Sequence, residues 1–363
     1  PMFLRNAWYV AAWDKEITEG LHTKKILNED IVFYRRQDGR VVALEDACPH
    51  RKLPLSMGRL HNDQLECGYH GLTFDCSGSC VKAPGMDKPP SGAQVRAYPL
   101  EERYGLLWIW MGDASLANPD SIFPVDHWGD PQWGLNQGDG MEVACNYLYI
   151  TDNLLDPTHV AWVHQSSFAG AACEDTPLEV TVADDGVTVW RWMMDVEPAP
   201  FYKPFLKFEG HSDRKQQYEV RYPSNALIKA VFCPIGTGGE ERELPANTFL
   251  MDSYNFMTPV DENHTRYYWF QMRNFAPDDL EVSRQFASAV RAAFQEDKEI
   301  LQRVHQGMAH KTTPNIDIKS DRGPTRFRRQ LAQMIAAEQE QVAQPGSART
   351  IPIQPARTEA VTA

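Results

Sequence analysis

Two short segments of the chain each pair a cysteine with a histidine. Cys48 and His50 lie in CPHRKLPLSMG and Cys67 and His70 lie in CGYHGLTFDCSG, with 16 residues between His50 and Cys67. Two thiolates and two imidazoles can converge from two loops on a metal centre. Structural zinc sites use the same ligand types, but zinc motifs favour Cys-x2-Cys and His-x3-His pairs. One cysteine and one histidine in each loop instead suit a two-iron cluster with thiolates on one iron and imidazoles on the other.

A second group of candidate ligands lies in DNLLDPTHVAWVH, where Asn153, Asp156, His159 and His164 stand at offsets of three, three and five. The first three can share one face of a helix, whereas an offset of five rotates a side chain by about 140°. Both histidines can therefore reach one point only if the helix is broken or bulged between them. Taken singly, Asp156 before Pro157 is also an ordinary helix N-cap.

A carboxylate stands at the centre of an apolar stripe near the C-terminus, in a helix expected over residues 279–306. The stripe in AVRAAFQEDKEILQRV consists of Val290, Ala293, Phe294, Ile300, Leu301 and Val304, and Asp297 lies among them. A buried carboxylate needs a cation or hydrogen-bond donors. Two histidines and one carboxylate form the facial triad that holds Fe(II) and leaves positions open for oxygen. Glu296 and Glu299 are expected on the solvated side of the helix.

The elements that must position these residues divide the chain into two domains. Strand-rich runs such as IVFYRR and LLWIWMG, separated by Asp-Gly, Pro and Gly, predict an all-β domain over residues 1–113. Residues 114–140 lack periodicity and are expected to form a linker. Residues 141–343 predict an α+β domain with a helix near 153–164, strands such as VTVWRW, YEVRYP and RYYWFQM, and the closing helix. Residues 344–363 are expected to be a C-terminal tail.

Composition excludes several classes of protein. The 363 residues carry 36 Lys and Arg against 49 Asp and Glu, and the net charge of −13 argues against binding to nucleic acid or an anionic membrane. The sequence contains no apolar run of the length that a membrane helix needs and no signal peptide, so a cytoplasmic location is expected. Seven cysteines, an odd and scattered number, favour a reducing compartment. Cys76 and Cys80 are expected to be packing thiols.

Both ligand groups together resemble the terminal oxygenase subunits of Rieske non-haem iron aromatic oxygenases. The resemblance implies an N-terminal all-β Rieske domain and a C-terminal helix-grip (START/Bet v1-like) catalytic domain with an antiparallel sheet and a long helix. It implies a Rieske [2Fe-2S] cluster held by Cys48, His50, Cys67 and His70, and a mononuclear Fe(II) held by His159, His164 and Asp297. Asp156 would bridge the two centres between neighbouring subunits of a homotrimer, and Asn153 would lie near the iron.

Within this group NAWYVAAW, KFEG, PIGTGG and RNFAPDD resemble oxygenase subunits of vanillate O-demethylases, dicamba O-demethylases and toluenesulfonate methyl-monooxygenases. The resemblance implies O2 as co-substrate and electrons from NAD(P)H through a flavin and ferredoxin-type reductase or a separate ferredoxin. The expected reaction hydroxylates a methyl or methoxy carbon of an aromatic acid, and a methoxy substrate loses formaldehyde. Aryl-methyl hydroxylation, N-demethylation and ring hydroxylation remain alternatives. A non-enzymatic Rieske electron carrier would leave the second ligand group unexplained.

The substrate site is expected among the strands between residues 171 and 274. Their aromatic side chains could line an apolar site or equally well form the core. The candidates are Trp190, Trp192, Phe201, Tyr254 and Phe256.

Overall fold

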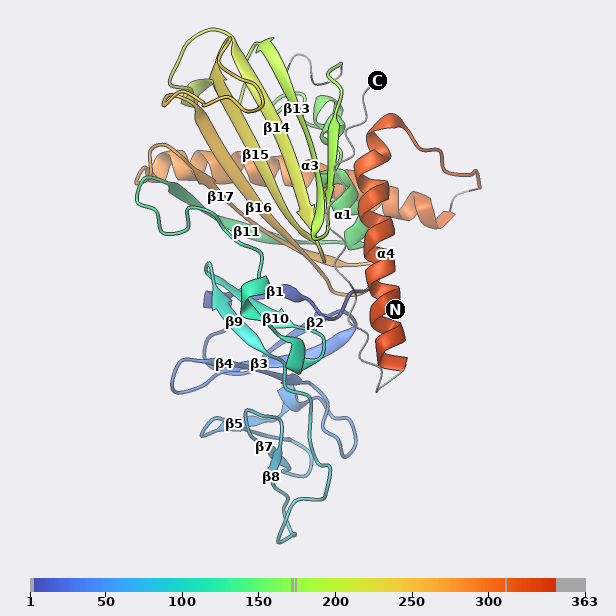
Figure 1. Ribbon diagram of the computed structural model, residues 1–363. Coiled ribbons are helices and arrows are strands. Elements are labelled where there is room, and N and C mark those ends of the chain that lie inside the picture. Colours follow the sequence, from blue (N-terminus) through green and yellow to red (C-terminus); the bar gives the residue numbers. More distant parts are fainter. Residues whose placement is uncertain (1–2, 171–172, 174, 311, 344–363) are drawn as a thin grey trace.

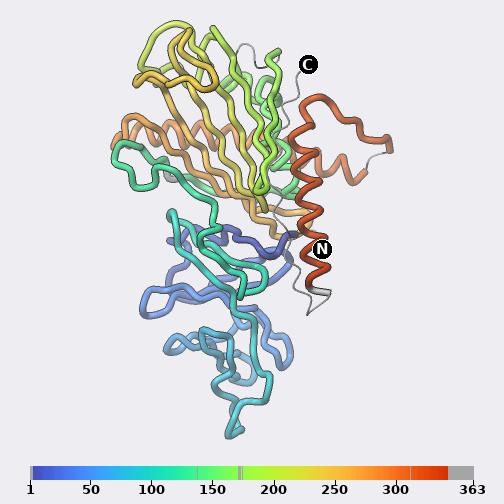
Figure 2. The backbone as a smooth tube through the Cα atoms, viewed as in Figure 1, coloured from blue at the N-terminus to red at the C-terminus, as the bar shows by residue number. Residues whose placement is uncertain are grey.

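The computed structural model describes residues 3–170, 173, 175–310 and 312–343, so the expected tail at 344–363 lies outside the described residues. The chain forms two parts, a smaller strand-only part at one end and a larger part of one sheet with helices (Figure 1). The tube in Figure 2 follows the same path, with the first 110 residues in blue and cyan below the larger part. The expected α+β class with an all-β N-terminal domain is confirmed.

The smaller part contains three antiparallel sheets with strand orders β1-β10-β9, β2-β3-β4 and β5-β6-β7-β8. The strands are β1 (Trp8–Trp13), β2 (His22–Ile26), β3 (Glu29–Arg35), β4 (Val41–Glu45), β5 (Arg59–His61), β6 (Gln64–Glu66), β7 (Thr73–Phe74), β8 (Cys80–Lys82), β9 (Leu100–Arg103) and β10 (Leu106–Trp110). Short 3-10 turns lie at Asp14–Glu16, Leu55–Met57, Ala114–Leu116 and Pro119–Ser121.

The larger part is built on a seven-stranded antiparallel sheet with the order β11-β17-β16-β15-β14-β13-β12. Its strands are β11 (Gly134–Val143), β12 (Glu179–Ala183), β13 (Gly186–Val196), β14 (Ser212–Arg221), β15 (Asn225–Pro234), β16 (Phe249–Pro259) and β17 (Thr265–Arg273). The helices are α1 (Tyr147–Leu154), α2 (Val160–Val163), α3 (Leu280–His310) and α4 (Arg322–Ala343), with 3-10 turns at Pro157–His159, Lys203–Phe205 and Lys319–Asp321.

The two faces of this sheet have different partners. On β17, Tyr267 and Trp269 pack against Phe294 of α3, with ring centroids about 5 Å apart. The intervening Tyr268 turns to the other face, where its hydroxyl donates to the carbonyl of Ala11 in β1. Strand residues therefore alternate between a core shared with the helices and a core shared with the smaller part. The long helix on one face of a curved sheet is the expected helix-grip arrangement.

Four expectations about the elements need correction. The helix expected at 153–164 begins earlier, at Tyr147, and it is interrupted after Leu154, as two histidines at one point require, because Pro157 has no backbone N–H to continue it. Residues 134–140, expected in the linker, belong to β11 and pair with β17. Ile300 and Val304, expected in the buried stripe, are 44% and 41% exposed. The buried face of α3 is therefore narrower than the apolar pattern.

The fourth correction concerns the last helix of the larger part. The sequence predicts that the helix near 279–306 is the last one, but α4 follows α3. Phe327 and Leu331 of α4 are buried, and Phe327 stacks on Tyr222. Arg328 makes a two-nitrogen ion pair with the carboxylate of Asp152 in α1. This helix therefore fixes α1, the element that leads into the second ligand group.

Gly58 lies where the chain turns into β5. Because it has no side chain, the backbone carbonyls of Leu55 and Glu66 can lie close to its Cα. A Cβ there would lie 2.0 Å from the Glu66 carbonyl oxygen and 2.9 Å from that of Leu55. We expect Gly58→Ala to lower the free energy of unfolding by about 1–3 kcal/mol in denaturant titrations, as overpacking does. The control is Gly307→Ala in α3, where a Cβ meets nothing within 4 Å. Equal stability of the two variants would contradict this packing.

Candidate functional site

The four Cys and His candidates of the smaller part lie on two loops with the same backbone shape. In each loop the backbone N–H of the cysteine donates to the carbonyl of the residue five positions later. The carbonyl of the same cysteine accepts from the N–H of the residue four positions later. These bonds are Cys48 to Leu53 (2.9 Å), Lys52 to Cys48 (2.8 Å), Cys67 to Leu72 (2.8 Å) and Gly71 to Cys67 (3.1 Å). Lys52 and Gly71 both adopt positive φ, 61° and 72°. The two loops therefore present their ligands as a matched pair.

The four side chains meet at the tip of these loops. Cys48 and Cys67 are each 2% exposed, whereas His50 and His70 lie at the surface with their Nδ1 atoms 3.2 Å apart. Burial raises the pKa of the Cys48 thiol, against the lowering effect of the backbone N–H groups of His50 and Arg51. Two buried sulfurs behind two surface imidazoles form a donor set that fits a two-iron cluster with an exposed histidine edge.

The seven cysteines are all unpaired, so the two ligand loops carry no bridging disulfide. Cys80 is partly buried against the core of the smaller part, as expected for a packing thiol. Cys76 is exposed in the turn between β7 and β8, so its expected role as a packing thiol is wrong.

His159, His164 and Asp297 come together in the larger part. One ligand atom from each residue lies within 4.8 Å of the other two. Asp297 Oδ1 lies 3.2 Å from His164 Nε2 and 3.7 Å from His159 Nε2. This oxygen is buried and has no hydrogen-bond partner in the described part of the chain. A metal cation between the three atoms would satisfy the carboxylate, and two imidazoles with one carboxylate suit Fe(II).

The break in the helix explains how both histidines reach this point. His159 ends the 3-10 turn Pro157–His159, and its Nδ1 lies 2.5 Å from the carbonyl oxygen of Asp156. His164 follows the single turn of α2 and leaves the helical conformation at φ −110° and ψ 39°. The two rings are 5.4 Å apart. A regular helix would have pointed the two histidines in different directions. Here the first histidine ends a 3-10 turn and the second follows the end of α2, so both rings can face the same point.

Glu296 contributes to the site although the sequence placed it on the solvated side of α3. Its Oε2 lies 2.7 Å from Nδ1 of His164, on the ring edge opposite the ligand nitrogen. Burial disfavours the protonated imidazole, but the negative charges of Asp297 and Glu296 beside the ring outweigh the effect of burial and raise the pKa of His164. The Glu296 side chain is 44% exposed, so burial patterns carry no signal for this contact.

Asp156 and Asn153 flank the three candidate iron ligands. The carboxylate of Asp156 caps the 3-10 turn by accepting from the Thr158 N–H (3.0 Å) and hydroxyl. Its other oxygen accepts from the Ser320 hydroxyl at 3.0 Å. Asn153 lines a small cavity that also includes Asp297 and Tyr267. Ser320 was missed because it lies in the segment before α4, far away in the sequence.

Four of the five aromatic candidates for the substrate site point away from it. Tyr254 and Phe256 belong to the core shared with the smaller part. Trp190 and Trp192 lie on the outer face of the sheet, the face away from α3, where both rings contact Lys215. Only Phe201 lies on the metal side, with its ring 4.8 Å from that of Phe168. Strand alternation explains this result, because neighbouring β13 residues such as Arg191 turn inward.

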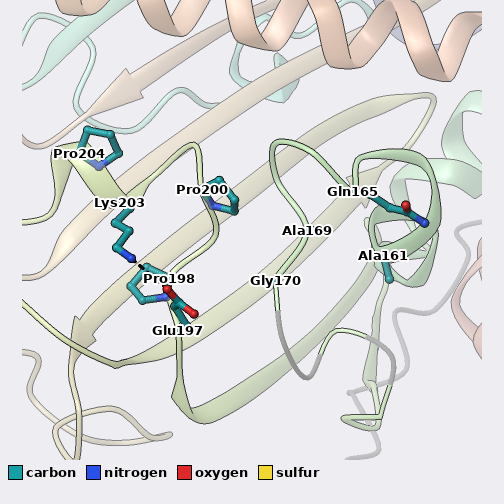
Figure 3. A pocket seen from close by; sticks show the side chains of 9 residues that line it. All are labelled: Ala161, Gln165, Ala169, Gly170, Glu197, Pro198, Pro200, Lys203 and Pro204. Atoms are coloured by element: carbon teal, nitrogen blue, oxygen red, sulfur yellow. Dashed lines mark hydrogen bonds and ion pairs between the residues drawn. The ribbon is translucent and has the colours of Figure 1, made fainter.

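A hollow opens beside the second ligand group. Figure 3 shows Ala161 and Gln165 on one wall and the segment around Pro198 on the other. Lys203 and Glu197 form an ion pair of 2.9 Å at its rim. Gly170 also lines the hollow, so this opening reaches the segment that follows His164.

No helix in the described ranges is long and apolar enough to cross a membrane.

The contact between Glu296 and His164 can be tested through its effect on metal binding. We expect Glu296→Gln to weaken Fe(II) binding by about 10-fold, because the partner of a ligand imidazole orients the ring and raises its basicity. Competition with a chelator measures the affinity. Glu299→Gln is the control, since it removes the same charge from α3 at an exposed position. Equal iron affinity in the two variants would contradict a role for Glu296.

Family models match both parts of the chain, the Rieske [2Fe-2S] domain over residues 7–99 and the vanillate O-demethylase oxygenase C-terminal domain over residues 143–337. The iron-sulfur subunit of the toluene-4-sulfonate monooxygenase system of Comamonas testosteroni is 38% identical over 93% of this chain and 98% of its own length. The vanillate O-demethylase oxygenase subunit of Pseudomonas sp. strain HR199 is 35% identical over 93% of this chain and 97% of its own length.

The crystal structure of dicamba monooxygenase bound to 3,6-dichlorosalicylic acid is similar over 95% of this chain and 100% of that chain, with a TM-score of 0.85 and 31% identity. The similarity thus covers both the Cys/His loops and the His/Asp group. The chain is therefore a Rieske-type non-haem iron oxygenase and belongs to the vanillate O-demethylase oxygenase family.

Proposed function

We propose that Cys48, His50, Cys67 and His70 hold the [2Fe-2S] cluster and that His159, His164 and Asp297 hold a mononuclear iron. The observation that carries the iron assignment is the buried Asp297 Oδ1, which lacks a hydrogen-bond donor in the described chain and faces two imidazole nitrogens. When bound, the cluster supplies electrons and the iron activates oxygen. The protein orients the ligands through the Asp156 carbonyl at His159 and through Glu296 at His164. Asn153, beside Asp297, is assigned to the polar surroundings of the iron.

The relatives are named as components of multi-component systems, which implies a separate reductase partner. We assign that partner the oxidation of NAD(P)H, through a flavin and a ferredoxin-type 2Fe-2S centre or through a separate ferredoxin. The exposed edge of His50 offers an entry point for electrons. The unpaired cysteines are consistent with a cytoplasmic, reducing location.

The proposed reaction is hydroxylation of a methyl or methoxy carbon of an aromatic acid. The named relatives act on toluene-4-sulfonate, vanillate and dicamba. Hydroxylation of a methoxy carbon gives a hemiacetal, which collapses to a phenol and formaldehyde. Hydroxylation of an aryl-methyl carbon stops at the alcohol. The second outcome is the alternative that the 38% identity to the toluene-4-sulfonate relative favours.

The positions of the two sites support a homotrimer that passes electrons between chains. The β5–β8 sheet and its ligand loops form one end of the molecule, whereas α1 and α3 belong to the other part (Figure 1). We assign Asp156 the role of accepting a hydrogen bond from His70 of a neighbouring copy, which would connect the two centres. A head-to-tail contact of this kind closes into a ring. We assign the cluster to the part formed by residues 1–113. We assign the iron to the part that begins with β11 (Gly134–Val143).

We expect Asp156→Asn to retain iron and acid-labile sulfide but to slow single-turnover oxidation of the reduced cluster by at least about 10-fold, since the amide removes the charged acceptor. Stopped-flow absorption of the cluster measures the rate. Asp184→Asn, at an exposed turn, is the control. An unchanged rate in Asp156→Asn would refute the bridging role.

Product analysis tests the reaction class. The reduced, iron-loaded protein is given oxygen with vanillate or with toluene-4-sulfonate. We expect formaldehyde and the matching phenol in equal amounts from vanillate, or 4-hydroxymethylbenzenesulfonate from toluene-4-sulfonate. Absence of both products in protein that contains cluster and iron would contradict attack on methyl and methoxy carbons.

A further inference from the structure

Two buried arginines lie side by side on the inner face of the sheet. Arg191 of β13 is 1% exposed and Arg214 of β14 is 3% exposed. Gln216 of β14 pairs with Arg191 across the two strands, and Arg214 pairs with Met193. All three polar side chains therefore occupy the face on which α1 and α2 lie. In most strands the apolar side chains face the core and the charged side chains face outward. This end of β13 has the opposite arrangement, with an arginine facing inward and two tryptophans facing outward.

The Arg191 guanidinium is only partly satisfied by its neighbours. Its Nε donates to Gln216 Oε1 at 2.8 Å and its Nη1 donates to the Thr176 carbonyl at 3.0 Å. Its Nη2 and the Nε2 of Gln216 are buried and have no hydrogen-bond partner among the residues described. Two donors on adjacent strands therefore lack an acceptor in the described part of the chain.

Arg214 is in the same situation. Its Nη2 donates to the Phe168 carbonyl at 3.0 Å, and its Nη1 lies 3.6 Å from Cys173 Sγ. Its Nε has no partner in the described part of the chain. The guanidinium carbon lies 5.1 Å from the ring centroid of Phe232 and 5.9 Å from that of Tyr202. Aromatic rings therefore flank the charge.

In the described part of the chain both guanidinium groups contact carbonyl, amide and thiol groups, and no carboxylate is among their partners. Asp156 acts on Arg191 only as a more distant charge. Burial lowers the pKa of Arg191, and the positive charge of Arg214 contributes in the same direction. Arginine nevertheless stays protonated in proteins. Two buried positive charges without a carboxylate partner in the described part of the chain are costly, so an anion that bound between them would lower the free energy of this region.

The pair lies next to the proposed iron site and to the hollow of Figure 3. Phe168, whose carbonyl accepts from Arg214, places its ring 6.3 Å from the ring of His164. Gly170 lines the hollow, and a Cβ at this glycine would lie 3.1 Å from Arg214 Nη1. Ala161, between the two histidines, packs in one cluster with Cys173 and Met193. A molecule entering from the hollow would therefore meet the arginines and the iron ligands in the same region.

We infer that Arg214, with Arg191 and Gln216, binds the carboxylate or sulfonate of an aromatic substrate, while the rings of Phe168, Tyr202 and Phe232 contact its aromatic part. This inference rests on the proposed function and adds the residues that select an acid. Planar guanidinium groups match the oxygens of both anions. Holding the acidic group at the arginines leaves the opposite end of the ring, with its methyl or methoxy group, to face His159, His164 and Asp297.

The test compares an acid with its uncharged amide by calorimetric titration of the full-length, iron-loaded protein. The probes are 4-methylbenzenesulfonate against 4-methylbenzenesulfonamide and 4-methoxybenzoate against 4-methoxybenzamide. We expect the unmodified protein to prefer the acid of at least one pair by about 10-fold or more. Arg214→Gln should weaken binding of that acid by about 10- to 100-fold and change binding of the amide by less than about threefold.

Lys215→Gln is the matched control, because this neighbour on β14 faces the opposite side and pairs with Glu240. It should bind both compounds of each pair as the unmodified protein does. Arg214→Lys keeps the charge but loses the planar fork and should bind the acid with intermediate affinity. If Arg214→Gln fails to fold, Arg214→Lys and Arg191→Gln supply the same comparison.

The inference is overturned if the unmodified protein binds each acid and its amide equally, or if Arg214→Gln weakens both equally, which would make Arg214 a packing residue. Product analysis separates this result from a failure of the proposed function. Oxygenated products without acid preference would remove the anion site and keep the reaction. Acid preference without any oxygenated product would keep the anion site and remove the reaction.

Discussion

Burying the carboxylate of Asp297 on the inner face of α3 costs free energy that no hydrogen-bond donor in the described part of the chain offsets at Oδ1. Two imidazole nitrogens face the same oxygen and can donate to it only when they are protonated. A bound cation resolves both problems, because it neutralises the carboxylate and takes the lone pairs of neutral imidazoles. The surrounding elements are arranged to bring these three atoms together.

The interruption between α1 and α2 is the main element of that arrangement. It brings His159 and His164 to one point, and it leaves the Asp156 carbonyl to hold one imidazole while Glu296 holds the other. Helix α4 then fixes the interrupted segment from outside through Arg328 at Asp152, and the 3-10 turn before α4 adds Ser320 at Asp156. The geometry of the candidate metal site thus depends on contacts between residues more than 100 positions apart in the sequence.

Residue types and short spacings were sufficient to select two groups of candidate ligands, and the structure brings the members of each group close together. Cys48, His50, Cys67 and His70 lie on adjacent loops, and Asp297 could be found because a carboxylate inside an apolar stripe is conspicuous. Contacts that depend on tertiary placement could not be found in this way. Glu296 is half exposed and resembles any surface glutamate, and Ser320 reaches Asp156 only because α4 returns to α1.

The substrate side of the sheet shows the limit of composition arguments more clearly. Trp190 and Trp192 suggested an apolar lining, yet they lie on the outer face of β13. The inner face carries Arg191. In a sheet covered on both faces, alternation does not reveal which set of side chains faces the site. Register and the position of α3 decide this, and both are properties of the folded chain.

Metal analysis of the purified protein and of Asp297→Ala tests the central claim most directly. A Rieske cluster and a separate iron site predict about three iron atoms and about two acid-labile sulfides per chain. The variant should lose about one iron atom and keep its sulfide and its visible absorption. Retention of all the iron in the variant, or loss of sulfide together with iron, would contradict two independent metal sites.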